Sequence, residues 1–476
     1  MTHILAIDQG TSGTKAIVVD ETGAVIALAE EPIHPRYLDG GGVEQDPQEL
    51  LDSVLVAGRR AVTTAGRPID AVALANQGET VLAWDPATGR ALTPALVWQD
   101  RRAESVCARL SDQDPWVAER TGLVLDPYFS GPKMRWIRDN WTLEGVVTTS
   151  DTWLIHQLCG AFVTDASTAS RSLLMDLDSV RWDDDLISLF GLTSERLPTI
   201  VACDDIVGTT TAFGPEVPVT GLIVDQQAAL LAEACLEPGS AKCTYGTGAF
   251  LLAQTGDVAV RSGAGLTTSV AWRLRGETPY CVDGQVYTAA SAVRWITDLG
   301  LIDEASQLDT VSAASSDGVL CVPALAGLAA PWWDPEARAS FSGMTLSSGR
   351  GQLVRSVLEG IAAQVAGLGG LVTHDLGAPL TRLRADGGLT KSRVLMQAQA
   401  DLSQIPIDVY PSAHATPLGA AACARLALDP TLSIADAVGT WAPESTYEPQ
   451  WSADQAQSHL DRWNTAAAAT LKAPPA

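Results

Sequence analysis

An acidic residue stands at the mouth of a loop near the start of the chain. Residues 4–16, ILAIDQGTSGTKA, place Asp8 at the end of an apolar run and follow it with glycine, threonine and serine. Glycine lets the chain turn tightly, so that several N–H groups and hydroxyls can face one phosphate. A carboxylate beside such a loop can hold Mg²⁺, directly or through water, while the metal bridges the phosphates. The alternative is a hairpin that binds nothing; the P-loop pattern G-x-x-x-x-G-K-[ST] is absent from the sequence.

A second acid, Asp225, stands where a strand is expected to pass into a helix, in VPVTGLIVDQQAALLAEACL. An aspartate in that place commonly serves only as the helix N-cap. A carboxylate that faces a cleft has another use, because it can accept the proton of a substrate hydroxyl as that hydroxyl attacks a γ-phosphate. Both interpretations fit this segment.

Two more glycine-rich turns occur in the second half of the chain. Residues 246–248 read Gly-Thr-Gly inside an expected hairpin, and ADGGLTKS at 385–392 joins a short strand to a helix. The N-terminus of a helix adds its positive dipole end to such a turn. Each turn alone is a weak signal, but the three together predict a nucleotide held between two lobes.

The elements that must position these residues follow from the apolar pattern. Residues 3–10, 14–23 and 24–33 are short apolar runs separated by turns, which predicts consecutive antiparallel strands. Residues 46–62 have helical spacing and begin with an Asp-Pro cap, and residues 352–368 are also strongly helical.

The chain is long enough for two domains. A length of 476 residues exceeds what one hydrophobic core usually organises. A second strand–turn–strand cycle begins near residue 240, just after Glu237-Pro238-Gly239. We therefore expect one domain over residues 1–236 and another over 237–476.

Composition excludes several classes of partner. The net charge of −25 disfavours nonspecific contact with nucleic acid or anionic membranes. The eight cysteines are scattered without a C-x-x-C pair, which argues against a zinc site or a disulfide framework. No apolar run is expected to reach the roughly 18 residues of a membrane helix, and the N-terminus lacks the pattern of a signal peptide. These features predict a soluble, cytoplasmic protein without membrane insertion.

Longer motifs in both halves resemble one family. In the first half they are AIDQGTSGTKAIVVD, GGVEQDPQEL, VWQDRR, TGLVLDPYFSGPKMRWIRDN, DTWLIHQLCG and TDASTASRSLL. In the second half they are DQQAAL, AKCTYGTGAF, GLAAPWWDPEAR, ASFSGMTLSSGRGQLVRSVLEG, DGGLTKSRVLMQAQAD and TPLGAA. The chain resembles the FGGY carbohydrate kinases over nearly its whole length, and within them the glycerol kinase branch. The stretches at 128–140 and 339–359 are similar to the two signatures of that family.

The resemblance implies an α/β fold of two actin-like, ribonuclease-H-like lobes, with ATP and Mg²⁺ in the cleft between them. It implies transfer of the γ-phosphoryl group to a terminal hydroxyl of glycerol or a related small polyol or sugar. On the phosphate side it implies Asp8 and Asp225 as metal-site acids, with Thr11, Ser12, Gly246, Thr247, Ala290, Gly388 and Ser392 around the nucleotide. On the acceptor side it implies Asp225 as the catalytic base and Gly78, Glu79, Trp98, Tyr128 and Gln226 around the substrate. A dimer or tetramer is also expected from the resemblance.

The pocket departs from the glycerol kinase pattern at two glycines. Gly78 stands where the family pattern Gln-Arg-Glu-Thr has its arginine, and Gly42 stands where Gly-Trp-Val-Glu has its tryptophan. A lost charged donor to a hydroxyl typically costs about 1.5–3 kcal/mol. The two changes suggest a larger acceptor, such as a four- or five-carbon polyol or ketose, with glycerol rejected; alternatively, neighbouring side chains refill the space. A different class, an ATP-gated binding protein without phosphotransfer, is the remaining alternative.

On the nucleotide side the departures are milder. Ser392 replaces an asparagine of the family's turn, and Ala290 replaces a glycine near the adenine. Neither change removes a charge, and ATP remains the expected nucleotide.

Overall fold

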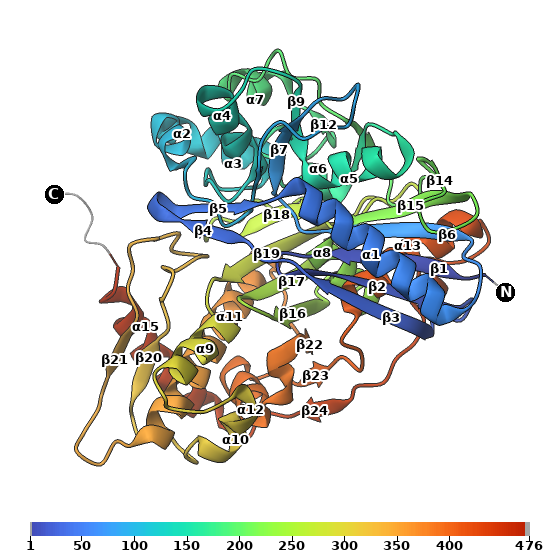
Figure 1. Ribbon diagram of the computed structural model, residues 1–476. Coiled ribbons are helices and arrows are strands. Elements are labelled where there is room, and N and C mark those ends of the chain that lie inside the picture. The colour runs from blue at the N-terminus through green and yellow to red at the C-terminus, as the bar shows by residue number, and fades with distance from the viewer. Residues whose placement is uncertain (1, 472–476) are drawn as a thin grey trace.

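The chain opens with three consecutive antiparallel strands, as its apolar pattern predicts. In the computed structural model, which describes residues 2–471, these are β1 (Ile4–Gln9), β2 (Gly13–Val19) and β3 (Val25–Pro32). They form one side of a six-stranded sheet of order β14-β15-β6-β1-β2-β3 (Figure 1). The other strands of this sheet are β6 (Ala71–Asn76), β14 (Gly208–Thr210) and β15 (Val217–Val224). At its centre β1, β6 and β15 run parallel.

Other elements pack on both faces of this sheet, as the alternating side chains of β1 show. Leu5 and Ile7 belong to a core cluster with α1 (Pro47–Ala65), whereas Ile4 and Ala6 belong to a different cluster on the opposite face. Helix α1 begins as predicted, because the Asp46 side chain accepts a hydrogen bond from the Gln48 N–H (2.8 Å). Its apolar side packs on β2 and β3.

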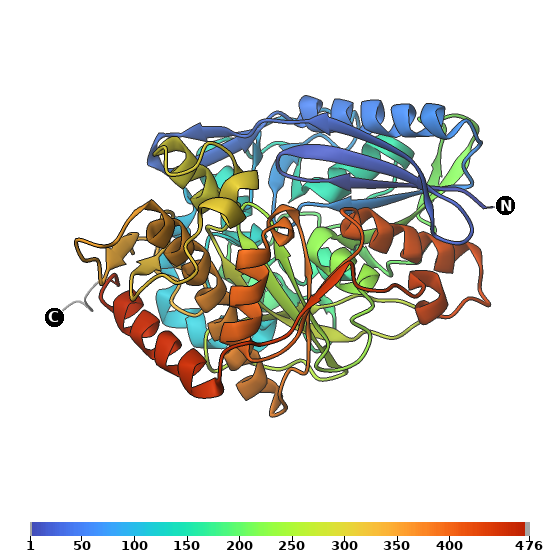
Figure 2. The same ribbon diagram turned by 90° about the horizontal axis from the view of Figure 1, so that it is seen from below.

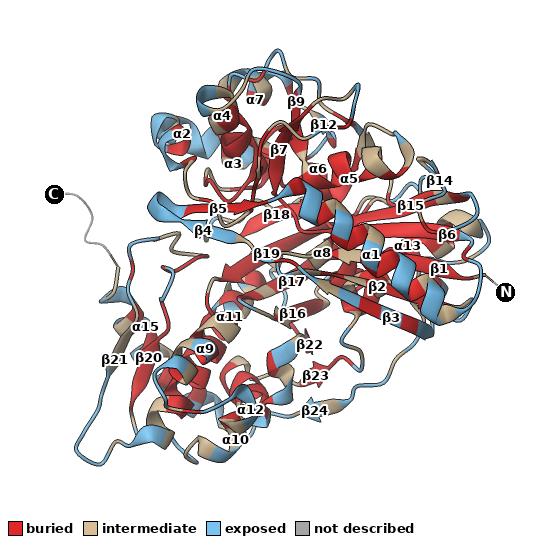
Figure 3. Cartoon of the chain, viewed as in Figure 1, coloured by how far each residue is buried: buried red, intermediate tan, exposed pale blue. Residues whose placement is uncertain are grey.

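A seven-stranded sheet of order β18-β19-β17-β16-β22-β23-β24 organises the second lobe. Its strands are β16 (Ala241–Tyr245), β17 (Ala249–Gly256), β18 (Thr267–Val270), β19 (Tyr280–Val286), β22 (Leu383–Asp386), β23 (Ile407–Val409) and β24 (Ser445–Tyr447). The helices and the strand pair that follow or cover it are α9 (Ala290–Asp298), α10 (Leu308–Val311), β20 (Leu320–Val322), β21 (Ser340–Ser342), α11 (Arg350–Leu376), α12 (Arg393–Ser403) and α15 (Ala453–Ala468). The central strands of both sheets are buried (Figure 3).

Helix α11 is longer and more apolar than the sequence suggested. Within residues 2–471 it alone is long and apolar enough to cross a membrane, which corrects the expectation that no such run exists. In this fold 72% of its most apolar window is buried, because the helix packs on β17, β19, β20 and α12. Its hydropathy is therefore that of a core helix.

Two helices join the lobes. Helix α8 (Asp225–Ala232) follows β15 directly, and α13 (Ala415–Leu428) packs along it. Although α13 comes after most of the second sheet in the chain, it lies against β1, β6 and β15 of the first sheet (Figure 2). With the short α14 (Ile434–Val438), it supplies the core on that face. The expected second domain extends to residue 476, and its last five residues, like Met1, lie outside the described part.

A smaller subdomain stands on the first sheet, at the top of Figure 1. It contains a five-stranded sheet of order β4-β5-β8-β7-β9. Its strands are β4 (Arg36–Leu38), β5 (Gly42–Gln45), β7 (Val81–Trp84), β8 (Ala95–Leu96) and β9 (Val146–Thr149). The surrounding elements are α2 (Glu104–Arg109), α3 (Asp114–Thr121), α4 (Ser130–Asn140), α5 (Ser150–Cys159), β10 (Val163–Asp165), α6 (Ala166–Ala169), β11 (Met175–Asp176), β12 (Arg181–Trp182), α7 (Asp184–Leu189) and β13 (Thr199–Val201).

Candidate active site

The parallel strands of the first sheet bring its candidate residues to one edge. Gln9 of β1 and Val224 of β15 both stand opposite Asn76 of β6, so the carboxyl ends of the three strands are level. Asp8 lies at the end of β1, the Gly78–Glu79 turn follows β6, and Asp225 begins α8. Ligands commonly bind at the carboxyl ends of strands in open α/β sheets.

The second sheet repeats this arrangement on the opposite side. Strands β16 and β22 run parallel, with Thr244 opposite Asp386, so the turns that follow them are neighbours. Gly387 has a φ of +95°, and a Cβ atom there would lie 2.5 Å from the carbonyl oxygen of Tyr245. Only glycine allows this close approach. The two glycine-rich turns of the second half are therefore held together.

A cavity of about 220 Å³ lies between the two edges and is lined from both lobes. Ten of the predicted site residues line it: Thr11, Ser12, Gly78, Glu79, Trp98, Tyr128, Asp225, Gln226, Gly246 and Thr247. Four further lining residues were not foreseen: Tyr37, Gln99, Thr244 and Phe250. Phe250, from β17, contacts Trp98 edge-on with ring centroids 6.0 Å apart, so an aromatic wall spans the two lobes.

The other four predicted residues, Asp8, Ala290, Gly388 and Ser392, lie outside this lining. The Ala290 N–H donates to the carbonyl of Gly246 (3.0 Å), which places it beside the second glycine turn. Gly388 opens a short helical turn, and nothing lies within 4 Å of the position of its Cβ atom. The Ser392 side chain is buried and already used: it donates to Asp309 (2.8 Å) and accepts from the Leu395 N–H at the start of α12 (3.2 Å).

The phosphate-type loop after β1 is tied to the wall of the cavity. The indole N–H of Trp98 donates to Thr11 Oγ1 (2.9 Å), and that hydroxyl donates to Gln77 Oε1 (3.0 Å). Gln77 in turn donates to Gln45 (2.7 Å), whose own amide donates back to the Thr11 carbonyl (2.7 Å). This closed set of hydrogen bonds fixes the loop relative to the Glu79 turn.

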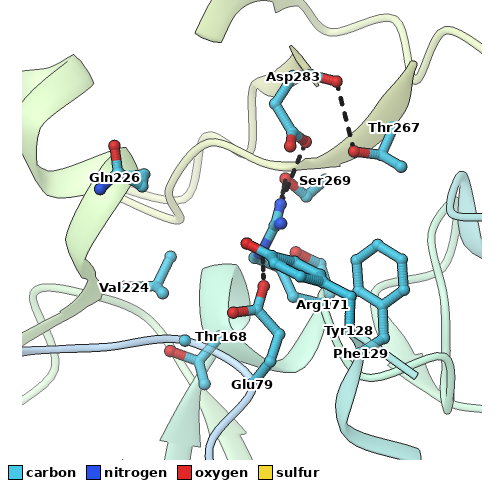
Figure 4. A network of polar contacts seen from close by, with 12 residues as sticks. Glu79, Tyr128, Phe129, Thr168, Arg171, Val224, Gln226, Thr267, Ser269 and Asp283 are labelled. Carbon is cyan, nitrogen blue, oxygen red and sulfur yellow. Dashed lines mark hydrogen bonds and ion pairs between the residues drawn. The ribbon is translucent and has the colours of Figure 1, made fainter. Parts of the chain in front are cut away.

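Glu79 is held by an arginine that the sequence reasoning did not single out. The Arg171 Nε atom donates to Glu79, and Arg171 Nη1 pairs with Asp283 of β19 at 3.1 Å (Figure 4). Arg171 lies in the quoted motif TDASTASRSLL, where a lone arginine among small and apolar residues was the available signal. Its partners come from distant parts of the chain, so the motif alone did not reveal its role.

Lys242 has a similar place beside Asp225. It is fully buried in β16, and its Nζ atom donates to Gln226 Oε1 and to Thr244 Oγ1, each at 2.7 Å. The Gln226 amide is thereby fixed with its oxygen toward the lysine. Both partners of Lys242 line the cavity, so this lysine shapes the cavity from behind.

The family models of known proteins match both halves of the chain. Residues 3–232 match the N-terminal domain of the FGGY family of carbohydrate kinases, and residues 241–428 match its C-terminal domain. The chain belongs to this family. The two-lobed α/β fold expected from the sequence resemblance is confirmed, and so is its class as an ATP-dependent kinase of the glycerol kinase type.

Full-length relatives agree with this assignment. The kinase is 38% identical to the glycerol kinase of Acinetobacter baylyi and 40% identical to that of Myxococcus xanthus, with 98% of each chain covered in both cases. A crystal structure of Plasmodium falciparum glycerol kinase with ADP is 32% identical and superimposes with a TM-score of 0.92, covering 100% of this chain and 99% of that one. A xylulose kinase from Lactobacillus acidophilus, 20% identical, shares the fold with a TM-score of 0.89 over 98% of both chains.

The acids of the kinase suit a divalent cation. Burial, together with the neighbouring charges of Asp225 and Asp386 and against the opposing charge of Lys15, raises the pKa of Asp8 to about 7. Burial also raises the pKa of Asp225, while Lys242 opposes the rise. Carboxylates that repel one another in this way would be stabilised by Mg²⁺, which needs only one or two protein carboxylates plus phosphate and water oxygens. Within residues 2–471 no group of three or more acidic, histidine or cysteine residues forms an all-protein metal site.

The two pocket glycines of the kinase have different surroundings. A Cβ atom on Gly78 would lie 3.0 Å from Val224 Cγ2, so a valine methyl borders the space that a side chain there would enter. A Cβ atom on Gly42 would lie 3.1 Å from Arg102 Nε, and Gly42 is not among the residues that line the cavity. Neighbouring side chains therefore border both positions, and only Gly78 faces the cavity.

Proposed function

We propose that this kinase transfers the γ-phosphoryl group of ATP to a terminal hydroxyl of glycerol or of a closely related small polyol. One observation carries the proposal: Asp225 and Glu79 line the same cavity as two of the glycine-rich turns. These are the turn after β1, with Thr11 and Ser12, and the turn after β16, with Gly246 and Thr247. An acceptor and a nucleoside triphosphate can therefore meet there with a carboxylate beside them. The similarity to glycerol kinases over the full length supports the choice of acceptor.

Asp225 is proposed to accept the proton from the attacking hydroxyl. It stands at the N-terminus of α8, where its Oδ1 accepts a hydrogen bond from the neighbouring Gln226 N–H (2.7 Å). Glu79 and Gln226 bind the other hydroxyls, one as an acceptor and the other through its amide. Trp98, Tyr128 and Phe250 exclude water from the carbon skeleton, which protects the phosphoryl group from hydrolysis.

The nucleotide phosphates are proposed to lie between the two loops. Thr11 and Ser12 offer hydroxyl and N–H donors from the first lobe, and Gly246 and Thr247 offer them from the second. Asp8 and Asp225 would hold Mg²⁺, which when bound neutralises the charge of the phosphates. Catalysis then rests on positioning and electrostatic stabilisation.

A four- or five-carbon polyol or ketose remains the second candidate acceptor. Gly78 lines the cavity without a side chain, so the wall there has no charged donor for a glycerol hydroxyl. An ATP-gated binding role without transfer is the alternative that the kinase class of the relatives disfavours.

Three features of the working enzyme are also part of the proposal. We expect a requirement for Mg²⁺, a dimer or tetramer, and a cytoplasmic location. The eight cysteines are all free in the structure, in keeping with a reducing compartment. Loss of turnover in excess EDTA with recovery on adding Mg²⁺, and the mass measured by sedimentation, test the first two.

The test is ADP release with MgATP against glycerol, erythritol, threitol, the pentitols and the corresponding ketoses. Glycerol is expected to lead; a longer acceptor leading by tenfold or more, about 1.4 kcal/mol, would transfer the proposal to the second candidate. Asp225→Asn is expected to abolish transfer while ATP binding, measured by calorimetry, persists. Asp183→Asn is the matched control, because Asp183 caps another helix, α7, and does not line the cavity. If the two variants have equal transfer activity, Asp225 is not the base and only begins the helix.

A further inference from the structure

Arg171 is a buried cation that does not itself face the cavity. It is 5% exposed and absent from the cavity lining, whereas its partner Glu79 lines the cavity. It follows α6 in the first lobe, yet one of its anchors, Asp283, belongs to β19 of the second sheet. The side chain thus joins an acceptor-site residue to the opposite lobe.

The guanidinium group is held on several sides. Its Nε atom donates to Glu79, and Nη1 donates to Asp283 Oδ1 at 3.1 Å. The second oxygen of Asp283 accepts from Gln285 Nε2 at 2.6 Å. The rings of Tyr128 and Phe129 lie with their centroids 5.7 Å from the guanidinium carbon, and Figure 4 shows both rings beside it. A planar, forked cation fits this arrangement, and an ammonium group does not reproduce it.

Arg171 also contacts a residue that is hydrogen-bonded to α8, the helix that carries the proposed base Asp225. Arg171 Nη1 reaches Ser269 Oγ at 3.5 Å, and that hydroxyl accepts from Gln227 Nε2 at 3.1 Å. Gln227 is two positions after Asp225 on α8. Contacts of one buried cation, Arg171, therefore link the turn that holds Glu79 to the helix that begins with Asp225.

We propose that Arg171 is the positioning residue of the acceptor site: it holds the Glu79 carboxylate in place and ionised, and Asp283 holds Arg171. The assignment of Glu79 to the acceptor rests on the proposed function. Arg171 acts through Glu79 and does not touch the substrate.

Glu79 needs such a partner for two physical reasons. Its φ of 56° lies in the left-handed region, which is unfavourable for a residue with a side chain, so the turn has to be held by its contacts. Burial also raises the Glu79 pKa; the charge and hydrogen bond of Arg171 oppose this, with a smaller contribution from Lys133, while Asp225 adds to the rise. A protonated Glu79 would donate to a substrate hydroxyl where an ionised one accepts.

The kinetic test compares two buried arginine–glutamate pairs. Arg138 pairs with Glu195 at 2.5 Å, is similarly buried, and neither partner lines the cavity, so Arg138→Lys is the matched control for Arg171→Lys. Both variants are expected to lower the melting temperature. Only Arg171→Lys is expected to lower kcat/KM for the acceptor, by about ten- to hundredfold, with KM for MgATP unchanged. Acceptor kinetics that are the same in both variants would overturn the proposal.

A second measurement does not depend on turnover. With ¹³C-labelled glutamate carboxyl groups, the Glu79 signal is identified by its loss in Glu79→Gln and followed against pH. In Arg171→Gln/Asp283→Asn, which removes one charge of each sign, Glu79 is expected to titrate at a higher pH than in the wild type. An unchanged titration would overturn the proposal. If the wild type phosphorylates no acceptor, the proposed function fails, while this titration still decides whether Arg171 controls Glu79.

Discussion

An arginine introduced at position 78 is expected to meet Val224 before it can serve an acceptor. The backbone of Gly78 lies outside the left-handed region, so a side chain is allowed there, but its Cβ atom would lie 3.0 Å from Val224 Cγ2. Val224 is 1% exposed and directly precedes Asp225. A buried β-branched side chain has little freedom to rotate, so making room for a new side chain is expected to disturb the start of the helix that carries the proposed base. Gly78→Arg alone is therefore expected to gain little with glycerol.

Val224→Ala should release this constraint. Removing two methyl groups costs about 0.8 kcal/mol of transfer free energy for each, plus a cavity contribution that the new arginine partly fills. A charged donor to a hydroxyl contributes about 1.5–3 kcal/mol, which corresponds to about 10- to 150-fold in kcat/KM. In the Val224→Ala background, Gly78→Arg should raise kcat/KM for glycerol at least about tenfold.

The assay is a double-mutant cycle on glycerol and erythritol turnover, followed by ADP release. Gly78→Ala is the control, because it introduces the contact with Val224 without the charge. We expect a coupling of about 1 kcal/mol or more between positions 78 and 224. An equal gain from Gly78→Arg with either residue at 224 would show that the valine does not limit the pocket, and a gain in neither background would show that this wall does not reach the acceptor.

Two buried groups give further predictions. Lys133 is fully buried and donates to the carbonyls of Pro127, Tyr128 and Phe129, so Lys133→Met should lower the free energy of unfolding by about 3 kcal/mol or more and raise the acceptor KM; unchanged denaturant midpoint and KM would contradict this. Burial raises the pKa of Asp151 from 3.8 to about 6, so the folded state binds more protons than the unfolded state between these values and stability falls as pH rises through that window. Asp151→Asn should reduce this pH-dependent loss of stability by up to about 3 kcal/mol. The free energy of unfolding in urea at pH 4.5 and pH 8 measures the effect, and an unchanged difference between the two pH values would refute the prediction.

Local pattern predicted the elements that carry the site. The three opening strands, the capped helix after Asp46 and the strand-to-helix passage at Asp225 are all present, because each depends on residues within a few positions of one another. One detail differs: Val224 is the N-cap of α8, and Asp225 is its first residue. The Asp225 side chain is thereby left beside the cavity.

Contacts between distant residues could not be predicted in this way. Arg171 and Asp283 are 112 positions apart, and nothing near either residue indicates the pairing. The filling of the space at Gly78 likewise depends on how β15 lies beside β6, which places Val224 against the turn. The roles assigned to the site residues, Asp225 and Asp8 among them, remain predictions.

The packing of α13 has a consequence for how the chain is made. One face of the first sheet is covered by α8 together with α13, which ends at Leu428. During synthesis, residues 1–236 leave the ribosome long before that helix exists, and the apolar face of β1, β6 and β15 has to wait for it. A truncated chain that ends at the seam would expose this face and aggregate, whereas the same fragment co-expressed with residues 237–476 should be rescued. The core of the first lobe thus includes a helix from the second half of the chain. The first lobe can be completed only after that helix has been made and has packed against the sheet.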